Sequence, residues 1–167
     1  MEIDIIPHRF LWKRNKKGGI AKSMRISTKG RYALRLMLDL ATYRTGEPVR
    51  LKEVAKRQQI SEKYLEQIIA VLNKAGYVRS IRGSQGGYIL KKEPEDYTVG
   101  MILRLIEGDL APVSCVGSGN EECERKSECV TVRVWEKLND AINGVIDNIT
   151  LADLVDWQNE KANEYVI

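Results

Sequence analysis

The chain has 167 residues, enough to bury a hydrophobic core without disulfide support. It is 43% hydrophobic and 30% charged, as globular proteins are, and no run approaches the roughly 20 apolar residues of a membrane-spanning helix. The net charge of +4 conceals a division, because residues 24–92 carry +10 and residues 93–167 carry −10. This asymmetry predicts that the basic part binds a polyanion, although a solvated basic surface would give the same numbers.

Residues 1–23 form a leader that carries a net charge of +4, the whole excess charge of the chain. The leader begins with acidic residues and lacks an apolar stretch with a cleavage site, so it does not resemble a secretory signal. Two interpretations stay open: a disordered basic arm, or codons read upstream of a true start at Met24. The second is favoured by Lys16-Lys17-Gly18-Gly19, which a ribosome-binding sequence can encode. The only histidine, His8, lies here and is not expected to bind metal.

Residues 24–92 have the pattern of a helix-turn-helix domain. The spacing of apolar residues predicts three helices, at about 28–43, 51–57 and 62–75. Ser27 or Thr28 can cap the first helix and Ser61 the third, and residues 58–60 form a tight turn between the second and the third. A bundle of three helices with one polar face would have the same spacing, so the segment that follows decides between the two interpretations.

That segment is a predicted β-hairpin, with strands at 77–81 and 88–90 around the basic, glycine-rich tip 82–87. A basic hairpin directly after a recognition helix is a wing, and its Arg82 is suited to the narrow minor groove. The polar first turns of the third helix are suited to base edges in the major groove. We therefore predict a DNA-binding surface that consists of Arg25, Thr28, Lys29, Arg31, Arg50, Lys63, Tyr64, Glu66, Gln67, Arg82 and Gly83.

The acidic part is predicted to contain a short helix that Thr98 caps and that runs to Glu107, a long helix from about Cys129, and a final helix capped by Thr150. The long helix has a heptad seam of apolar residues: Trp135, Leu138, Ile142, Val145 and Ile149. Such a seam can pack on the chain's own core or pair with a second copy. We expect a homodimer, because a palindromic operator needs a protein with twofold symmetry.

Three cysteines, Cys115, Cys123 and Cys129, lie within 15 residues around a glycine-containing loop. Three thiolates on one loop suit iron–sulfur or zinc ligation, and structural or redox-active thiols are the alternatives. A stable disulfide framework is not expected, because the number is odd and no secretion signal precedes it. Thiol redox catalysis is disfavoured as well, since the chain has no CxxC motif and no histidine near a cysteine.

From Met24 to about Gln158 the chain resembles the IscR-type bacterial transcription regulators, a family that includes NsrR and CymR. The stretches that carry the resemblance are MRISTKGRYALRLMLDLA, ISEKYLEQI, VRSIRGSQGGYIL, the three cysteines, CVTVRVW and NITLADLV. The resemblance implies a homodimeric winged-helix regulator with a [2Fe–2S] cluster on Cys115, Cys123 and Cys129. It also implies that the base contact of Glu66 depends on the state of the cluster, and it matches Arg82 to the wing arginine.

One ligand of that cluster is not identified by the resemblance. The best-known family members have a histidine three residues after the last cysteine, where this chain has Val132, and NsrR-like members have an acidic residue where this chain has Arg31. Valine cannot ligate a metal, so the fourth ligand stays open. The nearby carboxylates Glu121, Glu122, Glu124 and Glu128, an external thiol and water are the candidates.

We therefore expect a mainly α protein with a small β-hairpin wing. A winged helix-turn-helix domain at 24–92 precedes a cysteine-bearing segment at 93–128 and a dimerisation region at 129–167. The expected function is a cytoplasmic repressor of iron–sulfur cluster assembly or related stress genes, not an enzyme. It is expected to bind double-stranded palindromic DNA under the control of a [2Fe–2S] cluster that acts as a redox sensor. Neither a membrane nor a small-molecule substrate is expected as a partner. The alternative is a cluster-free regulator of the same fold that acts through a partner protein or thiol oxidation.

Overall fold

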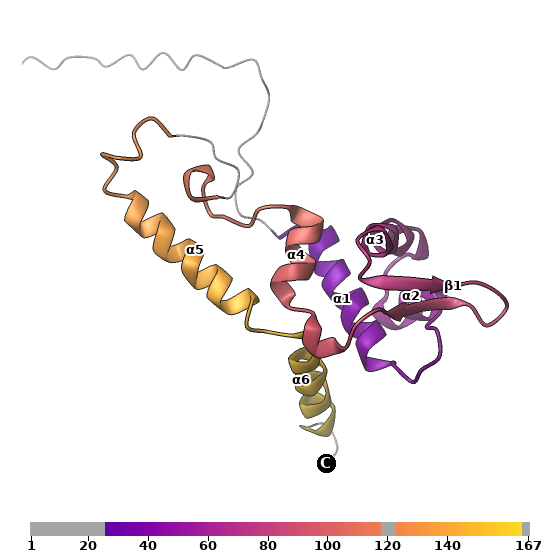
Figure 1. Ribbon diagram of the computed structural model, residues 1–167. Coiled ribbons are helices and arrows are strands. Elements are labelled where there is room, and N and C mark those ends of the chain that lie inside the picture. Colours follow the sequence, from indigo (N-terminus) through magenta and orange to yellow (C-terminus); the bar gives the residue numbers. More distant parts are fainter. Residues whose placement is uncertain (1–25, 118–122, 165–167) are drawn as a thin grey trace, which may run out of the picture.

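The computed structural model describes residues 26–117 and 123–164, and Figure 1 shows how their elements are arranged. Arg25 and the leader lie outside the described residues. The elements in chain order are α1 (Thr28–Thr42), α2 (Leu51–Gln58), α3 (Glu62–Lys74), β1 (Val78–Ile81), β2 (Gly87–Leu90), the 3-10 turn η1 (Pro94–Asp96), α4 (Val99–Glu107), the 3-10 turn η2 (Ser114–Val116), α5 (Val132–Ile146) and α6 (Leu151–Glu164). The mainly α fold with a β-hairpin is therefore confirmed.

Hydroxyl side chains cap the helices at the predicted places. Ser27, Ser61 and Thr98 each accept a hydrogen bond from a backbone N–H in the first turn of the helix that follows. Such caps satisfy N–H groups that have no partner within the helix. At α6, Thr150 and Asp153 exchange hydrogen bonds, the Asp153 N–H donating to Thr150 Oγ1 at 3.1 Å.

The hairpin is antiparallel, with Val78 opposite Leu90 and Ile81 opposite Gly87. Its second strand also pairs with the segment before α2, because Val49 and Tyr88 exchange two backbone hydrogen bonds. A Cβ atom on Gly87 would lie 2.5 Å from the Val49 carbonyl oxygen, so this close approach needs glycine. The pairing attaches the wing to the start of the helix-turn-helix.

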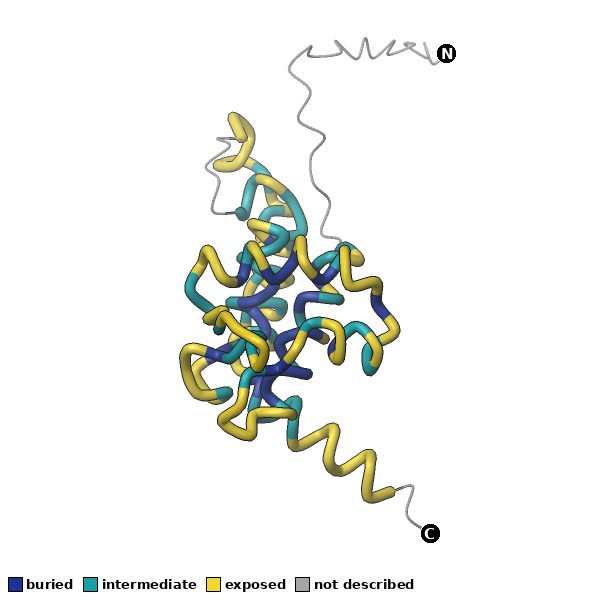
Figure 2. The backbone as a smooth tube through the Cα atoms, turned by 90° about the vertical axis from the view of Figure 1, so that its right-hand side faces the viewer, coloured by how far each residue is buried: buried dark blue, intermediate teal, exposed yellow. Residues whose placement is uncertain are grey.

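The core lies between α1, α2, α3, the hairpin and the starts of α4 and α6. Its buried side chains include Leu36, Leu65, Ile102 and Leu151. Backbone hydrogen bonds from Val99 to Ile149 and from Leu151 to Tyr97 join the starts of α4 and α6. Figure 2 shows the buried backbone in the middle of the molecule and the far end of α6 projecting from it with exposed residues.

One predicted boundary differs from the structure by more than one residue. The long helix was expected from about Cys129 but begins at Val132, because residues 124–131 form turns and Thr131 provides no side-chain cap. The last cysteine therefore precedes the helix. Among the described residues, no helix is long and apolar enough to cross a membrane.

Candidate DNA-binding face and cysteine loop

The turn between α2 and α3 has the geometry of a helix-turn-helix. Gln59 ends α2 in the left-handed conformation, with φ at 53°, and Ile60 is buried against the core. The Ser61 side chain then accepts a hydrogen bond from the Tyr64 N–H at 3.3 Å and starts α3. This sharp change of direction lays the first turn of α3 on the surface, where a recognition helix presents its side chains.

The predicted contacts of α3 differ in exposure. Lys63, Glu66 and Gln67 are exposed, whereas Tyr64 is half-buried. The Tyr64 ring meets the ring of Tyr32 of α1 edge to face, with 5.7 Å between the centroids. Lys63, Glu66 and Gln67 are therefore available to bases, and Tyr64 has a packing role as well.

The start of α1 presents further predicted contacts. Thr28 and Arg31 are exposed and Lys29 is half-buried, and Arg31 donates to Thr28 Oγ1 at 3.0 Å. Behind them, the carboxylate of Glu107 at the end of α4 accepts from the backbone N–H of Ser27 at 3.0 Å and from its hydroxyl at 2.6 Å. The end of α4 thus holds the start of α1 in place.

The wing tip is exposed from Arg82 to Gln85, and Gly83 has a φ of 109° that favours glycine. The predicted DNA contact Arg50 donates to the Ser84 carbonyl at 2.9 Å and to Gln85 Oε1 at 2.8 Å. In this structure Arg50 therefore ties the wing tip to the start of α2. Its hydrogen-bonding role was not evident from the sequence, because its partners lie more than 30 residues away.

The three cysteines lie on separate parts of the loop. Cys115 is half-buried in η2, Cys123 is exposed, and Cys129 is half-buried in the turn before α5. Cys129 Sγ lies 3.1 Å from Thr131 Oγ1, and this hydrogen bond, together with the backbone N–H of Val132, lowers the pKa of the thiol. Lowering the pKa increases the thiolate, which is the form that ligates metals and reacts with oxidants.

The three cysteine thiols are of the right kind to ligate an iron–sulfur cluster, but their side chains are not gathered at one point. Three thiols are suitable ligands, yet within 26–117 and 123–164 no three His, Cys, Asp or Glu side chains are gathered so that they could hold a metal ion. Of the candidate fourth ligands, Glu124 and Glu128 are exposed, and Glu121 and Glu122 lie outside the described residues. Val132, in the first turn of α5, offers no ligand atom.

Helix α5 contains no buried residue, and among the residues that the structure describes it has few contacts outside itself. Leu138 and Val145 of the predicted seam are 44% and 57% exposed, and Val134 beside them is 51% exposed. Trp135 and Ile142 are half-buried, and Ile149 packs on Val99, Leu103 and Leu110 of the same chain. The seam therefore divides: its last residue packs internally, and its middle presents an uncovered apolar face.

Comparison with known proteins identifies the chain. Residues 26–157 match the model of the Rrf2 family, described as "Iron-dependent Transcriptional regulator". The chain belongs to the Rrf2 family. It is 40% identical to the HTH-type transcriptional regulator CymR of Bacillus subtilis over 86% of this chain and 98% of CymR, and 40% identical to IscR of Serratia proteamaculans over 81% of each. These relatives are transcriptional regulators and not enzymes.

Among solved structures, IscR of T. potens matches with a TM-score of 0.66 and 47% identity, over 82% of this chain and 90% of that one. The family resemblance predicted from the sequence is confirmed. Since CymR and IscR relatives are equally similar to this Rrf2 protein, the comparisons establish the family and leave the kind of signal to be inferred.

Proposed function

We propose that this Rrf2 protein represses genes by binding a palindromic operator, with α3 in the major groove and the wing tip at the minor groove. The observation that carries the proposal is the exposed row Lys63, Glu66 and Gln67 on a capped helix, together with an exposed Arg82 at the base of the wing tip. The charge of +10 on residues 24–92 supplies attraction to phosphate. Thr28, Lys29 and Arg31 at the start of α1 extend this basic surface.

Selection of duplexes from a random-sequence pool tests this proposal. Wild-type protein should enrich a palindrome, and Glu66→Ala should change the preferred base at one position of each half-site, because a carboxylate accepts from the cytosine amino group. Arg82→Ala should weaken binding, and the affinity should fall steeply with salt. Failure of the wild-type chain to enrich any sequence would contradict the proposal.

We further propose that two copies pair through α5. The support is the apolar face of Leu138, Ile142 and Val145. The described residues leave Leu138 and Val145 exposed and bury Ile142 only in part. Pairing would bury this face and present two copies of α3 to two half-sites. The palindrome expected from the selection experiment follows from this symmetry.

The proposed signal is the state of a [2Fe–2S] cluster held by Cys115, Cys123 and Cys129. When bound, such a cluster supplies a redox-sensitive group whose loss or oxidation reports on iron, sulfide and oxidants. The lowered thiol pKa of Cys129 favours ligation. Protein isolated under anaerobic conditions should contain iron and sulfide, and replacing the three cysteines should remove both.

A second candidate is a cluster-free regulator that responds through its thiols or through a partner protein. It is favoured by Val132 at the position of the fourth ligand and by the absence of a gathered ligand set among the described side chains. Iron-free protein from anaerobic preparation, with operator binding that changes on thiol oxidation, would support this candidate. Zinc in place of iron would indicate a structural site.

A further inference from the structure

A row of side chains on one face of α1 holds the junction between α2 and α3. Tyr32, Arg35 and Asp39 follow at helical spacing, so they lie on the same side of α1. Each contacts a residue of the helix-turn-helix: Tyr32 meets Tyr64, Arg35 meets Gln58, and Asp39 meets both Arg57 and Gln58. None of the three belongs to the predicted DNA contacts.

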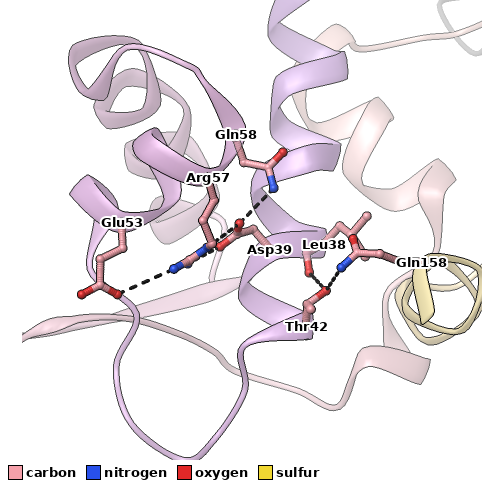
Figure 3. A network of polar contacts seen from close by, with 7 residues as sticks. All are labelled: Leu38, Asp39, Thr42, Glu53, Arg57, Gln58 and Gln158. Atoms are coloured by element: carbon pink, nitrogen blue, oxygen red, sulfur yellow. Dashed lines mark hydrogen bonds and ion pairs between the residues drawn. The ribbon is translucent and has the colours of Figure 1, made fainter. Parts of the chain in front are cut away.

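Asp39 is the anchor of this row. Its side chain is buried, and its two carboxylate oxygens accept from Arg57 Nη2 at 2.6 Å, from Arg57 Nε at 3.1 Å and from Gln58 Nε2 at 2.9 Å. Figure 3 shows Arg57 and Gln58 reaching this carboxylate from the end of α2, with Glu53 on the outer side of Arg57. The last turn of α2 is therefore fixed to α1 by a paired charge and an amide.

Gln58 also contacts the exposed side chain of Arg35. Its amide oxygen accepts from Arg35 Nε at 3.0 Å, and its backbone carbonyl accepts from a second nitrogen of Arg35. That carbonyl belongs to the end of α2, where no N–H within the helix can satisfy it. Arg35 thus binds the chain at the residue before Gln59, where the direction of the turn is decided.

Tyr32 continues the row to the recognition helix. The Arg35 guanidinium lies 5.6 Å from the centroid of the Tyr32 ring, and that ring packs edge to face on Tyr64 in the first turn of α3. Contacts of both kinds are favourable but weak, so their effect is on orientation more than on stability. The row joins the end of α2 to the start of α3 across the turn.

We propose that Tyr32, Arg35 and Gln58 are positioning residues that set the orientation of the first turn of α3, and with it the discrimination between operator and other DNA. The inference rests on the proposed operator binding. An exposed arginine on a basic domain would ordinarily be taken for a phosphate contact. Two nitrogens of Arg35 are instead committed to Gln58, so its loss should disturb base contacts more than the attraction to phosphate.

The test measures affinity for two duplexes of equal length. The wild-type chain enriches one of them from a random pool, and the other has the same base composition in scrambled order. Full-length Arg35→Ala should lose about tenfold in affinity for the enriched duplex and less than about twofold for the scrambled one, with an unchanged salt slope. Arg35→Lys should show the same selective loss, because an ammonium group cannot reproduce the two-nitrogen contact with Gln58.

The tyrosine and glutamine variants separate positioning from folding. Tyr32→Phe keeps the ring and should bind as wild type does, whereas Tyr32→Leu should lose discrimination. In a double-mutant cycle, Arg35→Ala and Gln58→Ala should be non-additive in operator affinity, since both remove the hydrogen bond from Arg35 Nε to the Gln58 amide oxygen. Lys161→Ala in the exposed part of α6 changes charge as Arg35→Ala does, and it should leave both affinities unchanged.

Three results would overturn the inference. Equal losses on both duplexes, with a salt slope reduced by about 0.9, would make Arg35 a phosphate contact. Wild-type discrimination in Arg35→Lys would show that charge alone suffices, and additive effects of Arg35→Ala and Gln58→Ala would show that the two side chains act independently. If the wild-type chain enriches no duplex at all, the proposed function fails, and this outcome is distinct from the other three.

Discussion

Asp39 is the one charged side chain that the described part of the chain buries almost completely, at 2% exposure. Its carboxylate is paired with Arg57, whose guanidinium also stacks on the Tyr43 ring at 3.9 Å from the centroid. Asp39→Ala would leave Arg57 and Gln58 without their acceptor while they stay partly buried. We expect a loss of about 3 kcal/mol in the free energy of unfolding, measured by urea denaturation.

Glu160→Ala is the control for this prediction, because Glu160 is an exposed carboxylate on α6. Its effect should stay within about 0.5 kcal/mol. If Asp39→Ala were as mild as the control, the buried pair would not stabilise the fold.

Backbone conformation at single residues gives a second prediction. Gln59 has a φ of 53° and Gly76 a φ of 76°, so both residues are in the left-handed region. The side chain of Gln59 is strained there, whereas Gly76 has no side chain. Gln59→Gly should stabilise the protein by about 0.5 kcal/mol, and Gly76→Ala should destabilise it by about 1 kcal/mol. Thermal unfolding should show a higher melting temperature for Gln59→Gly and a lower one for Gly76→Ala. Shifts of both melting temperatures in the same direction would contradict this prediction.

At the scale of elements, a polar contact joins α4 to the C-terminal end of α5. Arg104 of α4 donates to both carboxylate oxygens of Asp147 and to Asn143. Hydrogen bonds from Arg104 lower the pKa of the Asp147 carboxyl, so the contact stabilises the fold at neutral pH. Gly100 lies so close to this pair that a side chain there would overlap with it.

This contact predicts a pH dependence. Since the folded pKa of Asp147 is depressed, its contribution is complete above the unfolded value of about 3.9 and is lost as the pH falls through the folded value. Asp147→Asn should therefore lower the stability at pH 7 by less than about 1 kcal/mol, because the pair is half-exposed. Urea denaturation at pH 7 and pH 3 should show the gap to the wild type closing at the lower pH, and a gap that persists would contradict this assignment.

The helices could be predicted because their causes are local. Ser27, Ser61 and Thr98 cap where the sequence indicates, and the apolar spacing of each helix follows from its own residues. The start of α5 was missed by three residues, because Val130 is apolar in sequence and exposed in the turn. The bridge between Val49 and Tyr88 was missed since it pairs residues nearly 40 positions apart.

The candidate site divides in the same way. The exposed residues of α3 and the wing tip follow from the helix-turn-helix pattern, whereas the contacts of Arg35, Gln58 and Asp39 do not. The sequence alone indicates no partner for Arg35. Its contact with Gln58 becomes evident only from the packing of α1 on the end of α2. A charged residue on an inward-facing position, as Asp39 is, was the one available hint of a buried network.

At the scale of the whole molecule, the wing and α5 lie on opposite sides of the core (Figure 1). The division of charge follows this arrangement, because α1, α2, α3 and the hairpin lie within the basic part of the sequence, 24–92, and α4, α5 and α6 lie within the acidic part, 93–167. Acidic helices away from the DNA-binding face avoid repulsion from phosphate. No helix or strand of the described residues lies beyond α5 on the side remote from the wing (Figure 1).

Pairing through α5 gives the prediction for the assembly. Leu138→Asp places a charge on the uncovered apolar face and should convert a dimer into a folded monomer, as measured by sedimentation equilibrium. Asp140 lies on the opposite side of the same helix, so Asp140→Ala should leave the dimer intact. A Leu138→Asp protein that stays dimeric would show that the copies pair elsewhere.

The proposed function makes the cysteine loop the control of operator binding by the winged helix-turn-helix domain. Its most direct test is the affinity of the enriched duplex for anaerobically isolated wild-type protein and for the variant with Cys115, Cys123 and Cys129 all replaced by serine. We expect the two affinities to differ by about tenfold or more, while both proteins bind scrambled DNA equally. Equal affinity of the two proteins for the enriched duplex, before and after exposure to oxidant, would contradict it.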